Sequence, residues 1–293
     1  MNKRLLILSA ILICHTMIYS QTNQCLRASA GVGLVSMTYN LQGGTGKPKL
    51  GYGGKFTYSY FFARNWGFGV GFGASMLTTD GYLDGTKVTF ENKIDDEGHL
   101  FRKDVYFRDW HEIQKALLVE IPLMFSYHYD FGYKKRRKLY IDFGAKVKLP
   151  IMGSYEVTQG ELEIQGYYPA WNVLLFDLPN HGFGKDGSAR TSGPLSLPLT
   201  VAATVSLGFS FEVAPIIDVF TGVTFDYGFT NMKSSNDGDL LYEDPNSVLK
   251  YRGIMMSSAV EKANQISLQA EVGVRIAIGT KDGAIKFGQR KYK

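Results

Sequence analysis

Strict alternation of bulky and small residues over residues 50–79 constrains the fold of this chain more than any other feature. The segment reads as two strands joined by a short turn at residues 63–65. One side of the two strands carries the large residues Leu50, Tyr52, Phe56, Tyr58, Tyr60, Phe62, Trp66, Phe68, Val70, Phe72 and Met76. Glycine, lysine, threonine and serine fill the other side, and a period of two places the two sets on opposite faces of a sheet. A face almost without side chains is typical of a tightly curled sheet with lipid against its bulky side, whereas half of a soluble sandwich is the alternative.

The same device recurs along the chain and predicts eight strands. They cover approximately residues 26–39, 50–62, 66–79, 117–129, 139–149, 199–211, 219–229 and 266–278. The alternation slips near Ser36, which indicates a β-bulge in the first strand. Long connections at 80–112, 152–198 and 231–264 alternate with short turns. This pattern predicts an all-β fold, an eight-stranded antiparallel up-and-down transmembrane barrel with long extracellular loops and short periplasmic turns.

Within the connections, one segment carries strand signals and another carries none. Residues 87–90 and 105–107 could extend the flanking strands as a hairpin above the membrane. The stretch 152–198 is the longest irregular one, with a glycine-rich run at 181–187.

The N-terminal residues are typical of a secretory signal peptide. A basic start at residues 1–4 precedes an apolar run at 5–13, and Ser20 offers a small residue before the cleavage point. The apolar run is too short for a spanning helix, which needs roughly 20 apolar residues. We therefore expect a signal peptide at 1–20, a barrel domain at 21–279 and a periplasmic tail at 280–293.

Composition argues against a nucleic-acid partner and against an intramolecular disulfide. Loss of Lys3 and Arg4 with the signal peptide lowers the formal charge from +5 to +3, too little to indicate a nucleic-acid partner. Cleavage also removes Cys14 and leaves only Cys25, so the mature chain has no intramolecular disulfide.

Charged residues on the small-residue faces form the candidate site. The predicted lumen network consists of Lys55, Glu120, Asp142, Lys146, Lys148, Asp226, Glu271 and Arg275. Buried charges must be paired or hydrated, and eight strands leave an interior that side chains just fill. We expect interlocking ion pairs with small water pockets, and a conduction path is the alternative. The basic turn at residues 134–138, from Lys134 to Lys138, is either solvated or touches lipid headgroups or a periplasmic partner.

Residue patterns typical of catalytic or metal-binding sites are scarce in this sequence. The mature histidines His99, His111, His128 and His181 lie in no metal-ligand spacing, and we expect no metal, cofactor or catalytic residue. His181 with Asp177 and Ser188 could be drawn as a rim triad of a lipid-modifying barrel enzyme. The simpler interpretation is that His181 lies in an exposed loop.

Three short motifs carry a resemblance to a known family. They are WGFG at residues 66–69, EIPL at 120–123 and FDYG at 225–228. With the strand spacing, they resemble the OmpA-like and PorT-like outer-membrane β-barrels of Gram-negative bacteria, over the mature chain to about residue 279. The resemblance implies the cell outer membrane after Sec-type export, and it implies activity only weakly. OmpA proteins proper continue into a peptidoglycan-binding domain, whereas only residues 280–293 follow here, so tethering by such a domain is not expected.

The expected function is non-catalytic, a structural role in the cell envelope or a surface platform whose loops bind an extracellular ligand. Expected partners are outer-membrane lipids and lipopolysaccharide, with the chain acting as a monomer. A lipid-modifying enzyme and a component of transport or secretion machinery are the alternatives.

Overall fold

The computed structural model describes residues 23–41, 43–132, 136–187, 190–233, 238–246 and 248–278. The expected signal peptide at 1–20 and the tail at 280–293 lie outside the described residues. Within the part of the chain that is described, no helix is long and apolar enough to cross a membrane.

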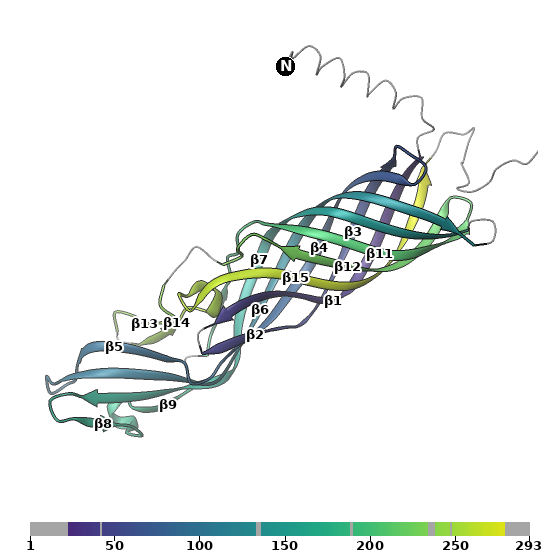
Figure 1. The fold of residues 1–293 in the computed structure, drawn as a ribbon. Coiled ribbons are helices and arrows are strands. Elements are labelled where there is room, and N and C mark those ends of the chain that lie inside the picture. Colours follow the sequence, from purple (N-terminus) through teal and green to yellow (C-terminus); the bar gives the residue numbers. More distant parts are fainter. Residues whose placement is uncertain are drawn as a thin grey trace, which may run out of the picture.

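Eight strands close into an antiparallel barrel (Figure 1). They are β1 (Asn23–Leu41), β3 (Leu50–Phe61), β4 (Trp66–Leu83), β6 (Leu100–Phe131), β7 (Arg137–Tyr168), β11 (Thr200–Ala214), β12 (Ile217–Gly228) and β15 (Val260–Ile278). Each strand pairs with the next of these, and β1 pairs with β15 from Gln24↔Ile278 to Leu41↔Val260, which closes the ring. The expected eight-stranded barrel is thus confirmed.

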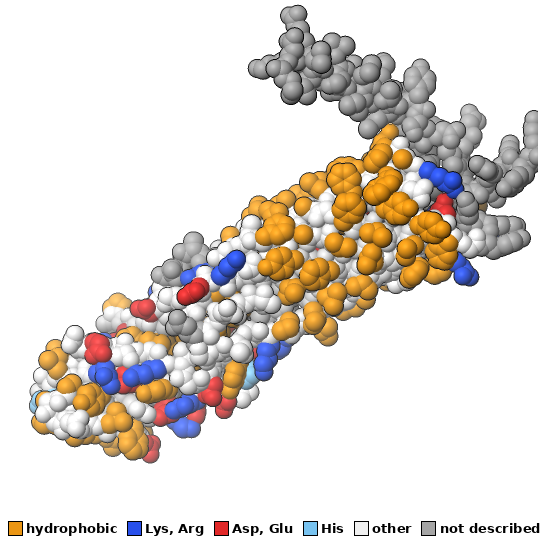
Figure 2. Space-filling model, in the orientation of Figure 1, with side chains coloured by type: hydrophobic (Ala, Val, Ile, Leu, Met, Phe, Trp, Pro, Cys, Tyr) orange, Lys and Arg blue, Asp and Glu red, His pale blue; other side chains and the backbone are white. Residues whose placement is uncertain are grey.

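Large apolar side chains cover the outside of one part of the barrel wall (Figure 2). Phe72 is 63% exposed, Phe125 is 47% exposed and Val223 is 48% exposed, although each lies in the middle of a paired strand. Charged side chains instead gather toward the two ends and over the extension beyond the wall. A continuous apolar surface of this extent is unstable in water, and its outward alternation is that of a membrane-spanning barrel.

Along β1 the inward-facing residues change from small and polar to apolar. Arg27 and Gly33 lie at the polar end, and Met37 and Leu41 are buried at the apolar end. The pairing of β1 with β15 continues without a shift through Ser36↔Ile266, and the first irregularity falls between Tyr39 and Leu41. The expected bulge near Ser36 is therefore wrong. The alternation slips because apolar residues leave the outer face and enter the inner one.

Two strands, β6 and β7, are 32 residues long and continue far beyond the apolar belt. β5 (Lys87–Ile94) pairs with β6, while β8 (Val173–Leu175) and β9 (Gly184–Asp186) pair with β7. We call these three strands, with residues 100–108 and 161–168, the distal module. The hairpin expected from residues 87–90 and 105–107 is confirmed. The irregular stretch expected from residue 152 is wrong in its first part, because β7 stays paired with β6 and buries Leu162 and Ile164.

Short elements cover the barrel mouth next to this module. β13 (Leu241–Glu243) and β14 (Leu249–Tyr251) form a hairpin, and the 3-10 turn η3 (Ile254–Met256) leads from it toward β15. β2 (Gly44–Pro48) extends the wall between β1 and β4, and β10 (Ser192–Pro194) pairs with β7. A second 3-10 turn, η2 (Pro179–His181), lies in the connection after β8.

Candidate functional site: the charged lumen

All eight predicted lumen residues lie inside the barrel, and four of them form one cluster. Lys148 Nζ lies 2.8 Å from an Asp226 oxygen and 3.4 Å from a Glu120 oxygen. Lys146 Nζ lies 2.9 Å from Asp226 and 3.5 Å from Glu120. Ser75 donates a further hydrogen bond to Glu120. This cluster contains two cations and two carboxylates, so its charges balance. It links β6, β7 and β12 inside the barrel.

A second group links β1, β3 and β15 to β7. Lys55 on β3 pairs with Glu271 on β15 at 2.7 Å, and the Tyr140 hydroxyl donates to Glu271 at 3.2 Å. Arg27 pairs with Asp142, and its guanidinium lies 4.9 Å from the centre of the Tyr140 ring. The aromatic ring therefore helps to hold a buried cation beside its carboxylate.

A third group lies toward the end where the described chain begins and ends. Asp218 accepts from Arg275 and, at 2.7 Å, from Lys138. Arg275 Nη1 lies 3.0 Å from His128 Nδ1. Lys138 belongs to β7 and is 5% exposed, so its assignment to a solvated basic turn is wrong. Lys134 lies outside the described residues.

Sequence reasoning missed Arg27, His128, Lys138 and Asp218 as members of the network. Phase alone could have found three of them. Arg27 shares its face with Ser29 and Gly31, His128 shares its face with Glu120 and Ser126, and Lys138 shares its face with Tyr140 and Asp142. Asp218 adjoins the turn at residues 214–217, where alternation has barely begun.

Two small cavities in this lumen are each about the size of a single water molecule. One cavity of about 20 Å³ is lined by Ser29, Lys55, Glu120 and Glu271 among others. Another of about 10 Å³ is lined by Arg27, Asp142 and Lys146 among others. A water molecule needs roughly 10–15 Å³ of such volume, so each cavity has room for about one.

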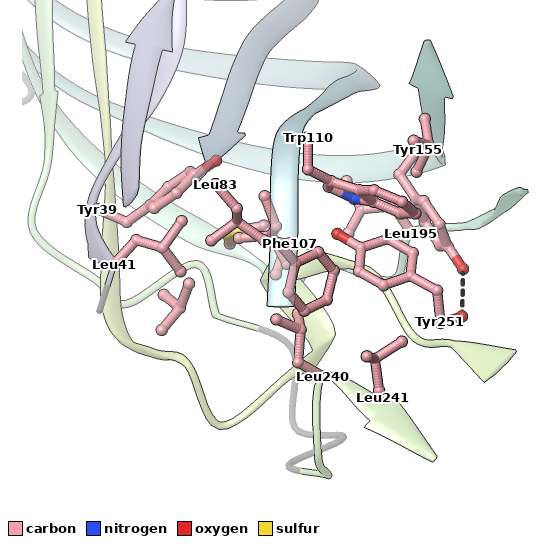
Figure 3. Close-up of a cluster of buried hydrophobic side chains, with 14 of the residues drawn as sticks. Tyr39, Leu41, Leu83, Phe107, Trp110, Tyr155, Leu195, Leu240, Leu241 and Tyr251 are labelled. Atoms are coloured by element: carbon pink, nitrogen blue, oxygen red, sulfur yellow. Dashed lines mark hydrogen bonds between the residues drawn. The ribbon is translucent and has the colours of Figure 1, made fainter. Parts of the chain in front are cut away.

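Above the charged zone the barrel mouth is filled by an apolar core (Figure 3). Phe107 and Trp110 of β6 meet edge to face at 5.2 Å, and Trp110 meets Tyr251 of β14 at 5.1 Å. The Tyr155 hydroxyl donates to the Tyr251 carbonyl at 3.4 Å. Leu240 and Leu241 complete the packing from the β13 side. The hairpin β13–β14 and the turn η3 form what we call the cover segment. We call the cluster the apolar plug, because side chains from the wall and from the cover segment close the mouth together.

Glu112 fastens the cover segment to the wall. This fully buried carboxylate lies above the apolar belt and accepts from the Tyr251 hydroxyl at 2.7 Å, the Gln114 amide at 2.7 Å and the Ile254 backbone N–H at 3.0 Å. Burial raises the pKa of Glu112 above its ordinary range, although the three hydrogen bonds act in the opposite direction. One side chain thus ties β14 and η3 to β6.

The structure gives no support to a catalytic triad of His181, Asp177 and Ser188. His181 is exposed in η2, Asp177 is exposed in the connection before η2, and Ser188 lies outside the described residues.

A closed antiparallel ring with an apolar exterior and an ion-paired interior defines a membrane-spanning β-barrel of the narrowest class. No family model matches the chain, and neither does any curated protein.

Several solved structures resemble the fold. Neisserial surface protein A is 12% identical, with 87% of this chain and 95% of that chain covered and a TM-score of 0.29. OprG from Pseudomonas aeruginosa is 10% identical, with 88% and 96% covered and a TM-score of 0.36. A major outer membrane protein from Thermus thermophilus is 12% identical, with 87% and 99% covered and a TM-score of 0.36. At these identities the likeness concerns the fold alone.

Proposed function

We propose that this chain is a monomeric, non-catalytic protein of the cell outer membrane that binds a ligand outside the cell and conducts no ions. The observation that carries this proposal is that β6 and β7 of the barrel wall continue into the distal module, while the barrel interior is filled at two successive levels. A closed lumen leaves the exposed extension as the part that can act.

The membrane location is supported by the two faces of the wall. Outward residues of the belt are apolar, inward ones are charged and paired, and a closed ring leaves no unpaired strand edge to lipid. Outer-membrane lipids and lipopolysaccharide are therefore the proposed neighbours of the belt, after Sec-type export.

Orientation follows from strand number. An even number of strands brings Gln24 and Ile278 together as a pair at one end, while the distal module lies at the other (Figure 1). We propose that the end with Gln24, Ile278 and the short turns is periplasmic, so that the distal module lies outside the cell. β6 ends at Phe131 and β7 begins at Arg137 at the same end as Gln24 and Ile278, where a lipid headgroup or a periplasmic partner could reach Arg136.

Closure of the lumen is supported by packing at both levels. Ion pairs fill the lower zone, and removing one member would leave a buried charge unpaired. The apolar plug fills the mouth, and apolar constrictions resist entry of water and ions.

Planar-bilayer recordings test the closed state. The wild type should show no steady conductance, and Glu120→Gln with Glu271→Gln should lower the unfolding temperature without opening a stable pore, because the apolar plug remains. A large, stable current from the wild type would overturn the closed lumen and favour transport.

Retention of cells that display the protein tests the binding role. Surfaces coated with neutral polysaccharide, acidic polysaccharide, protein or anionic lipid are compared, with cells that lack the protein as the control. We expect increased retention on at least one surface. Retention equal to that of the control cells on all four surfaces would reject surface binding.

A further inference from the structure

The tip of the distal module contains a large cavity, and the membrane role makes no use of it. The cavity measures about 440 Å³ and opens between the β5–β6 hairpin and the turn that follows β7. Its lining includes Glu91, Asn92, His99, Phe101, Arg102 and Trp171. Small-molecule sites usually have volumes of roughly 300–1,000 Å³ and combine aromatic walls with a few polar groups.

A stack of aromatic rings forms the wall of this cavity. Trp171 stacks on Tyr168 at 5.5 Å and 24°, and Tyr168 stacks on Phe101 at 5.4 Å and 18°. Phe101 meets the buried Phe183 edge to face at 5.7 Å. Trp171, at the outer end, is 56% exposed, whereas Tyr168 behind it is 6% exposed. Trp171 is therefore an exposed aromatic platform with a buried base, and the His99 ring borders it at 4.7 Å.

Hydrogen bonds fix this platform in place. Asp95 accepts from the Tyr168 hydroxyl at 3.1 Å and from the backbone N–H of His99 at 2.8 Å. The hydrogen bond from His99 holds the pKa of Asp95 below its usual range, so the carboxylate stays charged. On the other side of the turn, the Tyr167 hydroxyl donates to Asn172 at 2.9 Å. A platform fixed before binding loses little conformational entropy when a ligand arrives.

A distortion of β5 supplies the polar part of the lining. The register of β5 against β6 shifts between Phe90 and Lys93, and Asn92 has a φ of +57°. A bulge of this kind re-aims side chains, and here Glu91 and Asn92 line the cavity.

The charges near the cavity disfavour an anionic ligand. Arg102 is already bonded to Asp104 at 3.1 Å, a carboxylate that it shares with Lys87 at 2.9 Å, so its guanidinium is partly occupied. The neighbouring turn carries Asp95, Asp96 and Glu97, and Glu91 lies in the lining itself.

We propose that this cavity binds a neutral saccharide, with the apolar face of one sugar ring on Trp171 and its hydroxyls bonded by Glu91, Asn92 and Arg102. Polarised C–H groups are attracted to the negative face of an aromatic ring, and the carboxylate, amide and guanidinium match hydroxyl donors and acceptors. An acyl chain would bury these polar groups unpaired, which is costly. The inference rests on the proposed binding role and names the ligand class for it.

A glycan array tests the proposal with the full-length protein in a detergent that has no sugar headgroup, so that the detergent cannot compete. Neutral, sialylated and sulfated oligosaccharides are compared. We expect binding to neutral glycans, with Trp171→Ala lowering the affinity for the best of them about tenfold or more and Trp171→Phe lowering it less. The matched control is Leu174→Ala, an exposed apolar residue of β8 outside the cavity lining, which should bind like the wild type. Thermal unfolding of each variant shows whether the module is still folded.

The outcomes separate this inference from the function on which it rests. Cell retention only on protein, lipid or acidic polysaccharide would overturn the saccharide site and leave surface binding intact. Loss of retention on every surface would reject both. Neutral-glycan binding that survives Trp171→Ala would place the saccharide elsewhere and overturn the cavity assignment.

Discussion

Single glycines on the inner face of the barrel differ sharply in how much space surrounds them. A Cβ at Gly144 of β7 would lie 2.0 Å from the backbone carbonyl oxygen of Leu123 on the adjacent strand, a contact that cannot relax without moving that strand. A Cβ at Gly69 of β4 would meet the Ser59 hydroxyl at 2.9 Å, and a side chain can turn away. Position in the tight wall, and not glycine content, decides which of these residues is needed.

We therefore expect Gly144→Ala to destabilise the barrel by about 1–3 kcal/mol, because the added methyl group overpacks against backbone. Gly69→Ala, the matched control, should cost less. Urea unfolding in lipid vesicles measures both free energies of unfolding. Equal losses at the two positions would show that the strands adjust more freely than this packing implies.

At the same scale, phase was a good guide to the lumen and a poor one at strand ends. Alternation placed Glu120 and Asp226 on the inner face, but it could not pair them, because their partners lie on other strands. Lys138 was missed because four basic neighbours at 134–137 give it the composition of a turn. Ion pairing with Asp218 is long-range information that no local pattern contains.

Among the elements, the cover formed by β13, β14 and η3 depends most on one side chain. Glu112 holds this cover from β6, and burial raises its pKa. The folded chain therefore keeps this proton to a higher pH than the unfolded chain does. Its contribution to stability is fully present below the ordinary carboxyl pKa and is lost as pH rises through the raised pKa of the folded state.

We expect Glu112→Gln to weaken this fall in stability toward alkaline pH, measured as the unfolding temperature across a pH series. Glu163→Gln is the contrasting control. A hydrogen bond from Arg108 lowers the pKa of Glu163, so its contribution is lost as pH falls. The two variants should therefore change opposite limbs of the profile. An unchanged alkaline limb in Glu112→Gln would mean that this carboxyl does not govern the cover.

Elements beyond the belt were harder to predict than those within it, for a definite reason. In β6 the register shifts between Arg108 and His111, where Asp109 has a φ of +46°. The inward residues are therefore even-numbered from Trp110 onward but odd-numbered before the shift, as at Phe107. Two further shifts lie between His111 and Glu112 and between Leu117 and Leu118, where the extra residue is on β7. Each shift breaks the period of two, and a continuous strand then reads as a loop.

For the whole molecule, the orientation is directly testable. Protease added to intact cells should cut near Gly98, in the exposed turn between β5 and β6, and near Lys185, an exposed residue of the short strand β9, and should spare the turn between β6 and β7. Cells with a permeabilised outer membrane provide the control, since the turn should then become accessible. Cleavage at the turn in intact cells, with the distal module protected, would invert the proposed orientation. The third expected outward position, Asp237, lies outside the described residues.

The change of interior from charged to apolar along a single strand means that alignment errors are penalised twice. A one-residue slip of β1 against β15 would turn Arg27 toward lipid and, in the same movement, expose Met37 and Leu41 to water. A barrel with a uniform interior would suffer only the first penalty. The correct register is thus favoured by two independent costs of a slip: a charge exposed to lipid at one end of the strand, and apolar side chains exposed to water at the other.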